Sequence, residues 1–270
     1  MYMKYKRNER IGALTYMLTN SPNKIFTYNY FSEKLDAAKS TISEDIFIVK
    51  ESIEKLDVGN VVTIPGASGG VKFVPKVNKI EETRFLVELA EKLSDPERIT
   101  AGEFVFMTDI IYSPNVSEVI GRIFASRFIE QDIDYVVTIE TKGIPMAFAT
   151  ARSLNVPLVV IRKDIKVTEG ATVNVNYVSK SNKNIQSLSL ARNSMKEHSK
   201  VLVIDDFMRG GGTLAGIRSM MKEFKSEIVG VGVLVSRNSE EFNREQNISS
   251  LLRLDEIDEA EERLTIVPNL

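Results

Sequence analysis

Apolar side chains recur at helical spacing through most of the first 60 residues. The clearest stripe predicts one long helix, with apolar positions at Ile42, Ile46, Val49, Ile53 and Leu56. Two shorter helices are predicted before it, over residues 7–19 and 28–35, and the first is stopped by the segment Asn20-Ser21-Pro22-Asn23. Thr41 followed by Glu44 is the pattern of a capping box, so we expect the long helix to start there.

Two short apolar segments follow the third helix. Residues 61–64 and 71–74 are predicted strands, and the glycine-rich segment between them is typical of a turn. Three helices followed by a hairpin is the order of a winged helix-turn-helix domain. We therefore expect one domain over residues 1–74 and a second over residues 75–270.

The second domain alternates between helical and extended patterns. The order predicts an α/β fold with a mostly parallel sheet that is covered by helices on both faces. Its predicted strands are residues 135–139, 158–161, 201–204 and 228–235, and its predicted helices are 80–93, 145–154 and 214–224. Residues 163–200 are polar, with a possible strand pair around VNVNYV, and we interpret them as a mobile arm or flap.

Composition narrows the function classes. Of 270 residues, 43% are hydrophobic, enough for a large core, and the chain has no cysteine, which excludes disulfides, thiolate zinc sites and cysteine nucleophiles. His198 is the only histidine, so we expect no imidazole cluster for a metal. The net charge of −2 predicts no nucleic-acid partner by itself. Without a long apolar run or a signal-peptide pattern, we expect a cytoplasmic protein with no membrane partner.

The most specific chemistry lies in VLVIDDFMRGGGTLAGI, residues 201–217. A predicted strand is followed by Asp205 and Asp206, then by a glycine run and Thr213 at the start of a helix. Ligands of open parallel sheets bind at the carboxyl ends of the strands, and glycine amides before a helix N-terminus can hold a phosphate. Two carboxylates beside a phosphate loop suit a sugar phosphate, because the carboxylates can bind the sugar hydroxyls.

A second polar turn is predicted near this loop. It follows the strand over residues 135–139 and offers Thr141, the positive charge of Lys142 and the close backbone approach of Gly143. Arg162 and Lys163, at the end of the next strand, add positive charge to the same crevice or form a solvated strand end.

Two known nucleotide motifs are excluded by spacing. The chain has no G-x-x-x-x-G-K-[ST] segment, and GGGTLAG does not follow G-x-G-x-x-G. The alternative for Asp205 and Asp206 is a solvated strand end, which does not explain the glycines or Thr213.

The candidate DNA contacts lie in the first domain. Recognition helices present their N-terminal residues to base edges. The candidates are therefore Lys39, Ser40, Thr41 and Ser43, with Lys4, Lys6, Arg7 and Lys72 as phosphate contacts. The alternative is that the winged helix serves in protein association.

Residues 201–217 resemble the motif with which type I phosphoribosyltransferases bind phosphoribosyl pyrophosphate (PRPP). The resemblance implies that Asp205 and Asp206 hold the ribose hydroxyls, that the turn at Lys142 holds the pyrophosphate, and that Mg²⁺ arrives with the ligand rather than as a required cofactor. It assigns the 5-phosphate to a loop formed by Arg209, Gly210, Gly211, Gly212 and Thr213. The transferases often have Thr where this chain has Gly210.

Over essentially its whole length the chain resembles the purine operon repressor (PurR) family of Gram-positive bacteria. The segments that carry the resemblance are KSTISEDI, TKGIP, KVTEGATVNVNYVS and IDDFMRGGGT. The resemblance implies a homodimeric repressor of purine synthesis and transport genes, with operator DNA as partner and PRPP as inducer. Guanosine tetra- or pentaphosphate, or a purine nucleotide, is our hypothesis for a competing ligand.

The same fold serves purine phosphoribosyltransferases, so an active transferase with an added nucleic-acid-binding domain is the alternative. A transferase must also orient a base, and the sequence offers only Phe207 as a stacking surface. We therefore expect a sensor with no catalytic residues.

Overall fold

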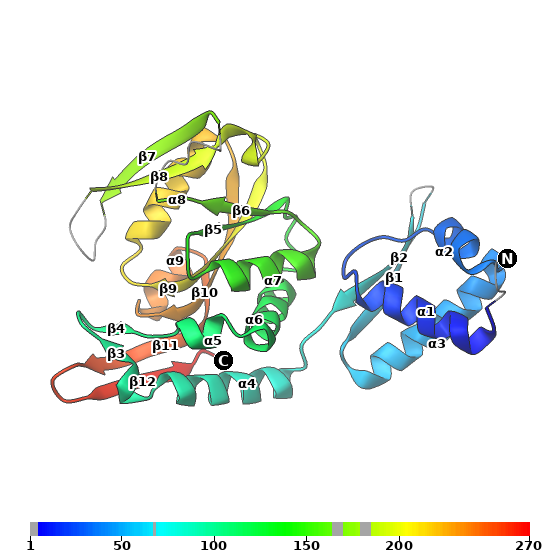
Figure 1. The fold of residues 1–270 in the computed structure, drawn as a ribbon, viewed down its shortest axis with the longest axis horizontal. Helices are drawn as coiled ribbons and strands as arrows, with labels where there is room; N and C mark the ends of the chain where they lie inside the picture. The colour runs from blue at the N-terminus through cyan, green and yellow to red at the C-terminus, as the bar shows by residue number, and fades with distance from the viewer. Residues whose placement is uncertain (1–4, 67–68, 164–169, 179–184) are drawn as a thin grey trace. The chain divides into compact units, whose positions relative to one another are not determined.

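The chain folds into two compact units in a computed structural model, which describes residues 5–66, 69–163, 170–178 and 185–270. One unit holds residues 1–79 and the other holds most of residues 80–270. Figure 1 shows the course of the chain through both. No helix in these described ranges is long and apolar enough to cross a membrane.

The first unit is a winged helix-turn-helix domain, as predicted. Its elements are α1 (Arg7–Thr19), α2 (Tyr28–Leu35), α3 (Lys39–Leu56), β1 (Gly59–Ile64) and β2 (Gly70–Pro75). The apolar stripe of α3 is buried from Ile42 to Ile53 and packs with side chains of α1, α2, β1 and β2 in one core. Strands β1 and β2 pair in antiparallel register, and Phe26 adds a bridge to Val71.

The start of α3 differs from the prediction. The helix begins at Lys39, with Ala38 as its N-cap, so Thr41 lies inside the first turn and the expected capping box at Thr41 and Glu44 is wrong. The turn before it is set by Asp36, whose φ of 48° is left-handed and ends α2. The chain therefore re-enters the helical conformation earlier than the capping pattern suggests.

The second unit is an α/β domain whose main sheet has six strands. Its elements are α4 (Lys79–Leu93), β3 (Ile99–Thr100), β4 (Phe104–Val105), α5 (Thr108–Ile111), α6 (Pro114–Arg127), β5 (Tyr135–Ile139), α7 (Ile144–Leu154), β6 (Leu158–Ile161), β7 (Thr172–Val178), β8 (Ile185–Ala191), β9 (Lys200–Met208), α8 (Gly212–Glu223), β10 (Glu227–Ser236), α9 (Glu240–Glu245), β11 (Ile248–Asp258) and β12 (Arg263–Pro268). The strand order is β12-β11-β10-β9-β5-β6, and all pairs are parallel except β11 with β12.

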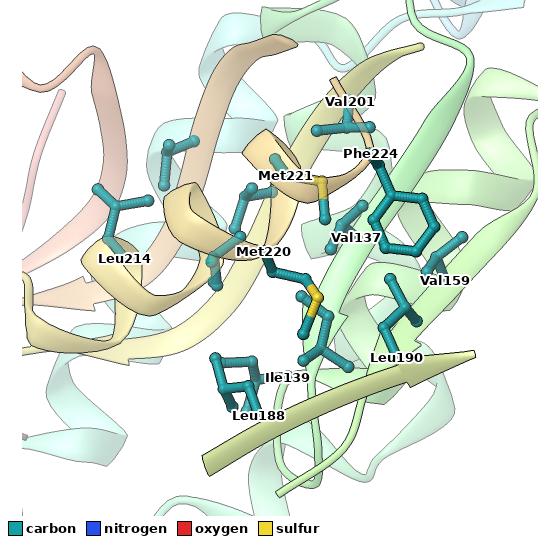
Figure 2. Close-up of a cluster of buried hydrophobic side chains, with 14 of the residues drawn as sticks. Val137, Ile139, Val159, Leu188, Leu190, Val201, Leu214, Met220, Met221 and Phe224 are labelled. Carbon is teal, nitrogen blue, oxygen red and sulfur yellow. The ribbon is translucent and has the colours of Figure 1, made fainter. Parts of the chain in front are cut away.

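Both faces of this sheet are covered, as predicted. On one face, α8 and the β7–β8 hairpin enclose a core that contains Met220, Met221, Phe224 and Leu188 (Figure 2). On the other face, Phe124 of α6 lies against Gly232 of β10.

The predicted strand pair in the polar segment is confirmed as the antiparallel hairpin β7–β8. Residues 164–169 and 179–184, which belong to the predicted flap, lie outside the described residues.

Candidate functional site

A cavity of about 580 Å³ lies at the carboxyl ends of β5 and β9 in the second unit. It brings together the end of β9, the start of α8, the β5–α7 turn, the β7–β8 hairpin and the segment around β4. Its lining residues are Thr100, Phe104, Val105, Phe106, Met107, Ile139, Glu140, Thr141, Lys142, Lys163, Tyr177, Gln186, Asp205, Asp206, Phe207 and Thr213.

The two adjacent aspartates lie within β9 rather than after it. The predicted strand stops at residue 204, but pairing with β10 continues to Met208, so the prediction of the strand end is wrong. Asp205 is 7% exposed, and its Oδ1 accepts the backbone N–H of Asp206 at 3.0 Å. Asp206 is half-buried, and both carboxylates line the same cavity.

Both carboxylates have raised pKa values. Burial raises the pKa of Asp205 well above its usual value, and the negative charge of Asp206 adds to this effect. Burial also raises the pKa of Asp206, against the opposing effects of its hydrogen bond with Asp205 and of the Lys142 charge. Hydrogen-bond donors such as sugar hydroxyls favour the charged form of buried carboxylates.

The glycine loop leads from β9 into α8. Gly210 and Gly211 have φ values of 70° and 68°, a left-handed conformation that a β-branched residue such as Thr rarely adopts. Helix α8 begins at Gly212, so Thr213 lies in its first turn, where backbone N–H groups have no acceptor inside the helix. Thr213 also forms a hydrogen bond with Tyr177, whose pKa is raised by burial.

Of the loop residues assigned to the 5-phosphate, Thr213 lines the cavity. Arg209 and Gly210 to Gly212 are not among its lining residues. The guanidinium of Arg209 lies 3.5 Å from the carboxylate of Glu103, and the N–H of Gly210 donates to Oδ1 of Asn238 at 2.7 Å.

The turn between β5 and α7 lies against the aspartates. Thr141 and Lys142 are exposed and line the cavity, and the peptide before Thr141 is cis. Gly143 is buried, and a Cβ there would lie 2.6 Å from Oγ1 of Thr138 and 3.2 Å from Oδ1 of Asp205. Glycine is therefore required for this close approach of the turn to β9.

Arg162 and Lys163 have different positions. Lys163 lines the cavity, and its backbone N–H donates to Oε1 of Glu140 at 2.6 Å. Arg162 forms an ion pair with the other oxygen of Glu140 at 3.2 Å and is not among the lining residues. Of the two, Lys163 is thus the one placed to bind an anionic ligand.

Sequence reasoning missed the apolar wall of the cavity. Phe104 and Phe106 are 44% and 45% exposed although both contribute to the lining, and Tyr177 and Gln186 come from the hairpin. The FVFM segment is too short to carry a periodic signal, so its approach to Asp206 and Phe207 could not be foreseen.

Within the described ranges, no group of three or more acidic or histidine side chains is arranged to hold a metal ion. His198 is exposed and lies outside the cavity lining.

The proposed recognition residues lie together at the start of α3. Lys39, Ser40 and Ser43 are exposed, while Thr41 is half-buried. Two hydroxyls and one amine are thus available at the helix N-terminus, the part of a recognition helix that contacts bases.

The side chains proposed as phosphate contacts in the same unit differ in whether they already contact protein groups. Lys6 is exposed, whereas Arg7 lies 3.4 Å from the buried carboxylate of Asp45 and Lys72 donates to Asn23 at 3.3 Å. Lys4 lies outside the described residues. Arg10 of α1 pairs with Asp45 at 2.7 Å, so this buried carboxylate has a basic partner within the same unit.

Comparison with known proteins supports both halves of this description. Residues 6–75 match the family described as bacterial purine repressor, N-terminal, and residues 107–266 match the phosphoribosyl transferase domain. The chain is 45% identical to the purine biosynthesis transcriptional repressor PurR of Bacillus subtilis, over 98% of this chain and 93% of the relative. The chain belongs to the PurR family.

A second PurR relative is named differently. The purine biosynthesis transcriptional activator PurR of Lactococcus lactis is 39% identical, over 97% of this chain and 96% of the relative. Both PurR relatives are named as transcriptional regulators, in agreement with the expectation of a regulator rather than an enzyme.

Among solved structures, adenine phosphoribosyltransferase from Thermoanaerobacter pseudethanolicus has a TM-score of 0.52 at 18% identity, covering 62% of this chain and 98% of that one. This likeness confirms the predicted phosphoribosyltransferase fold of the second unit.

Proposed function

We propose that the chain is a homodimeric repressor of purine biosynthesis and transport genes, acts on operator DNA in the cytoplasm, and is induced by PRPP. The observation that carries the proposal is the cavity in which Asp205 and Asp206 meet Thr213 and Lys142, in the same chain as a winged helix. The names of the PurR relatives support the purine genes as targets.

The chemistry of the cavity matches the parts of PRPP. Asp205 and Asp206 accept hydrogen bonds from the ribose hydroxyls, which offsets the burial of their charge. The N–H groups at the start of α8, with the hydroxyl of Thr213, bind the 5-phosphate. Lys142 and Lys163 bind the pyrophosphate, and Mg²⁺ enters with it, since phosphates are its usual ligands in such sites.

Induction follows from thermodynamic linkage. PRPP lowers operator affinity to the extent that it binds the DNA-free form more tightly, and each tenfold difference corresponds to about 1.4 kcal/mol. The negative charge of PRPP also weakens the electrostatic attraction of the protein for DNA.

A second ligand of the same site is guanosine tetra- or pentaphosphate. Its pyrophosphate and ribose suit the groups that bind PRPP, and the exposed rings of Phe104 and Phe106 with Phe207 supply aromatic surface for a base. We expect it to compete with PRPP and to leave the operator complex intact.

The proposal is tested by titrating PRPP with Mg²⁺ against a labelled operator fragment and measuring fluorescence anisotropy. We expect release of the operator, and guanosine tetraphosphate should raise the PRPP concentration required. Operator binding that rises with PRPP would indicate activation. A coupled assay with adenine, guanine, hypoxanthine and xanthine tests the transferase alternative. Turnover of any of these bases would show that the chain is an active transferase.

A further inference from the structure

The glycine loop is attached to a segment far from it in the sequence. The N–H of Gly210 donates to Oδ1 of Asn238, 28 residues away, at 2.7 Å. The backbone N–H of Arg237 donates to the carbonyl of Met208 at 3.0 Å. Residues 237 and 238 directly follow β10, the strand that pairs with β9. The segment after β10 therefore supports the loop.

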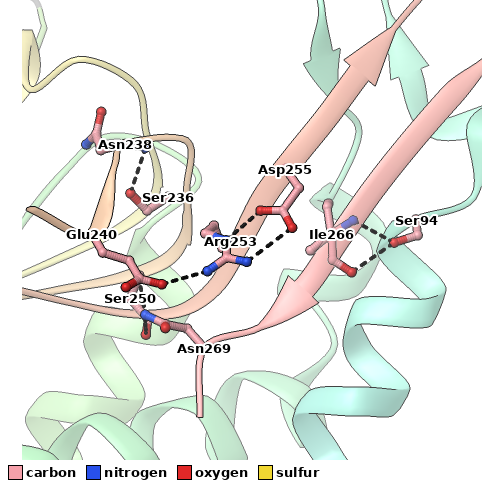
Figure 3. A network of polar contacts seen from close by, with 9 residues as sticks. All are labelled: Ser94, Ser236, Asn238, Glu240, Ser250, Arg253, Asp255, Ile266 and Asn269. Atoms are coloured by element: carbon pink, nitrogen blue, oxygen red, sulfur yellow. Dashed lines mark hydrogen bonds and ion pairs between the residues drawn. The ribbon is translucent and has the colours of Figure 1, made fainter.

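Asn238 is itself held in place from the sheet. Its backbone N–H donates to Oγ of Ser236 at 3.2 Å (Figure 3), and that hydroxyl donates to Oδ1 of Asn243 at 3.2 Å. Ser236 is fully buried and Asn243 nearly so. The backbone of Asn238 is therefore held to the end of the sheet, from which its Oδ1 atom reaches the N–H of Gly210.

The amide nitrogen of Asn238 has a different environment. Its Nδ2 atom is enclosed and has no hydrogen-bond partner within the described part of the chain. Burying an unpaired amide group is unfavourable. Within the described residues the side chain of Asn238 therefore acts through its acceptor, which binds the N–H of Gly210 in the glycine loop.

A loop with this composition needs such an attachment. Gly210 and Gly211 are both left-handed, and glycine samples many other conformations at little cost. A side chain at position 211 is also excluded, because a Cβ there would lie 2.8 Å from the ring of Phe242. The hydrogen bond from Gly210 to Asn238 thus holds the loop in the conformation that leads into α8.

We propose that Asn238 is a positioning residue for the 5-phosphate: it fixes Gly210 and so presents the start of α8 and Thr213 to the ligand before binding. This inference rests on the proposed function of the cavity. The N–H of Gly210 is already used by Asn238, so the 5-phosphate is bound by later amides of the loop and not by this one.

Isothermal titration with PRPP and Mg²⁺ tests the proposal on the full chain. We expect Asn238→Ala to weaken PRPP binding about tenfold, the loss of about one net hydrogen bond. Operator affinity without PRPP and the melting temperature should stay close to those of the wild type. The matched control is Asn193→Ala, an exposed asparagine of the same domain outside the cavity lining, which should bind PRPP like the wild type.

Hydrogen exchange read by mass spectrometry tests the contact without a ligand. Asn238→Asp keeps the acceptor, so peptides that cover residues 208–214 should exchange as in the wild type, and faster in Asn238→Ala. Equal exchange in all three proteins, or equal PRPP affinity of Asn238→Ala and wild type, would overturn the positioning role. A wild-type chain that does not bind PRPP would instead refute the proposed effector, and the exchange result would still decide whether Asn238 orders the loop.

Discussion

Asp206→Asn is the most direct test of how the cavity binds its ligand. The substitution removes one negative charge and one strong acceptor but keeps the size of the side chain. Asp206 is half-buried and lines the cavity, and burial raises its pKa. We expect the charged form to be stabilised by ribose hydroxyls, so the variant should bind PRPP more weakly.

The size of the effect follows from the hydrogen bonds that are lost. A hydrogen bond to a charged group contributes about 1.5–3 kcal/mol, so the Kd for PRPP should rise about tenfold to 100-fold. Removing a negative charge also lowers the repulsion of the ligand phosphates, which opposes this change. Lys142 and Lys163 line the same cavity and already compensate part of that repulsion, so the loss of hydrogen bonds should dominate.

The assay is isothermal titration with PRPP and Mg²⁺, followed by operator release measured by fluorescence anisotropy. The PRPP concentration for half-release should rise by the factor found for the Kd, while operator affinity without PRPP stays unchanged. Asp132→Asn is the control, because Asp132 is exposed and pairs with Lys200 at the opposite end of β9.

Two results would refute this reasoning. A wild-type Kd for PRPP would mean that Asp206 does not bind the ribose. Loss of operator binding in the absence of PRPP would mean that this carboxylate has a structural role.

Three further predictions concern charge. Burial raises the pKa of Asp205, so the wild type loses stability as the pH rises through that pKa. Asp205→Asn should therefore have a higher melting temperature than the wild type at neutral pH. The difference should disappear toward about pH 4, the ordinary pKa of an aspartate. A pH-independent difference in melting temperature would contradict this. Arg10→Ala removes the 2.7 Å partner of the buried carboxylate of Asp45 and leaves Arg7 at 3.4 Å. In urea denaturation it should lower the unfolding free energy of the first unit, by less than the about 3–5 kcal/mol expected for an unpaired buried charge. Lys6→Ala should reduce the salt slope of operator binding by about 0.9 per lost phosphate contact. An unchanged slope removes that lysine from the contacts.

Local patterns predicted the parts of the fold that depend on local structure. The helix over residues 7–19 and the strand over residues 135–139 have the predicted bounds, because apolar periodicity and stop signals lie within each segment. Errors occurred where a distant partner decides the boundary: β9 continues to Met208 because β10 pairs with it that far. Residues 99–127 and 240–268 contain helices and strands that were not predicted, since their patterns are short or irregular.

The family resemblance and the order of the two domains followed from the sequence alone, as did the acidic doublet with its glycine loop. These features are contiguous in the chain, so backbone geometry and residue type are enough to indicate their chemistry. The tertiary structure decided which side chains share the cavity with them: Phe104 and Phe106, Tyr177 of the hairpin, and Asn238 beneath Gly210. Such contacts arise from strand pairing and close packing between segments tens of residues apart, and no local sequence pattern records those long-range constraints.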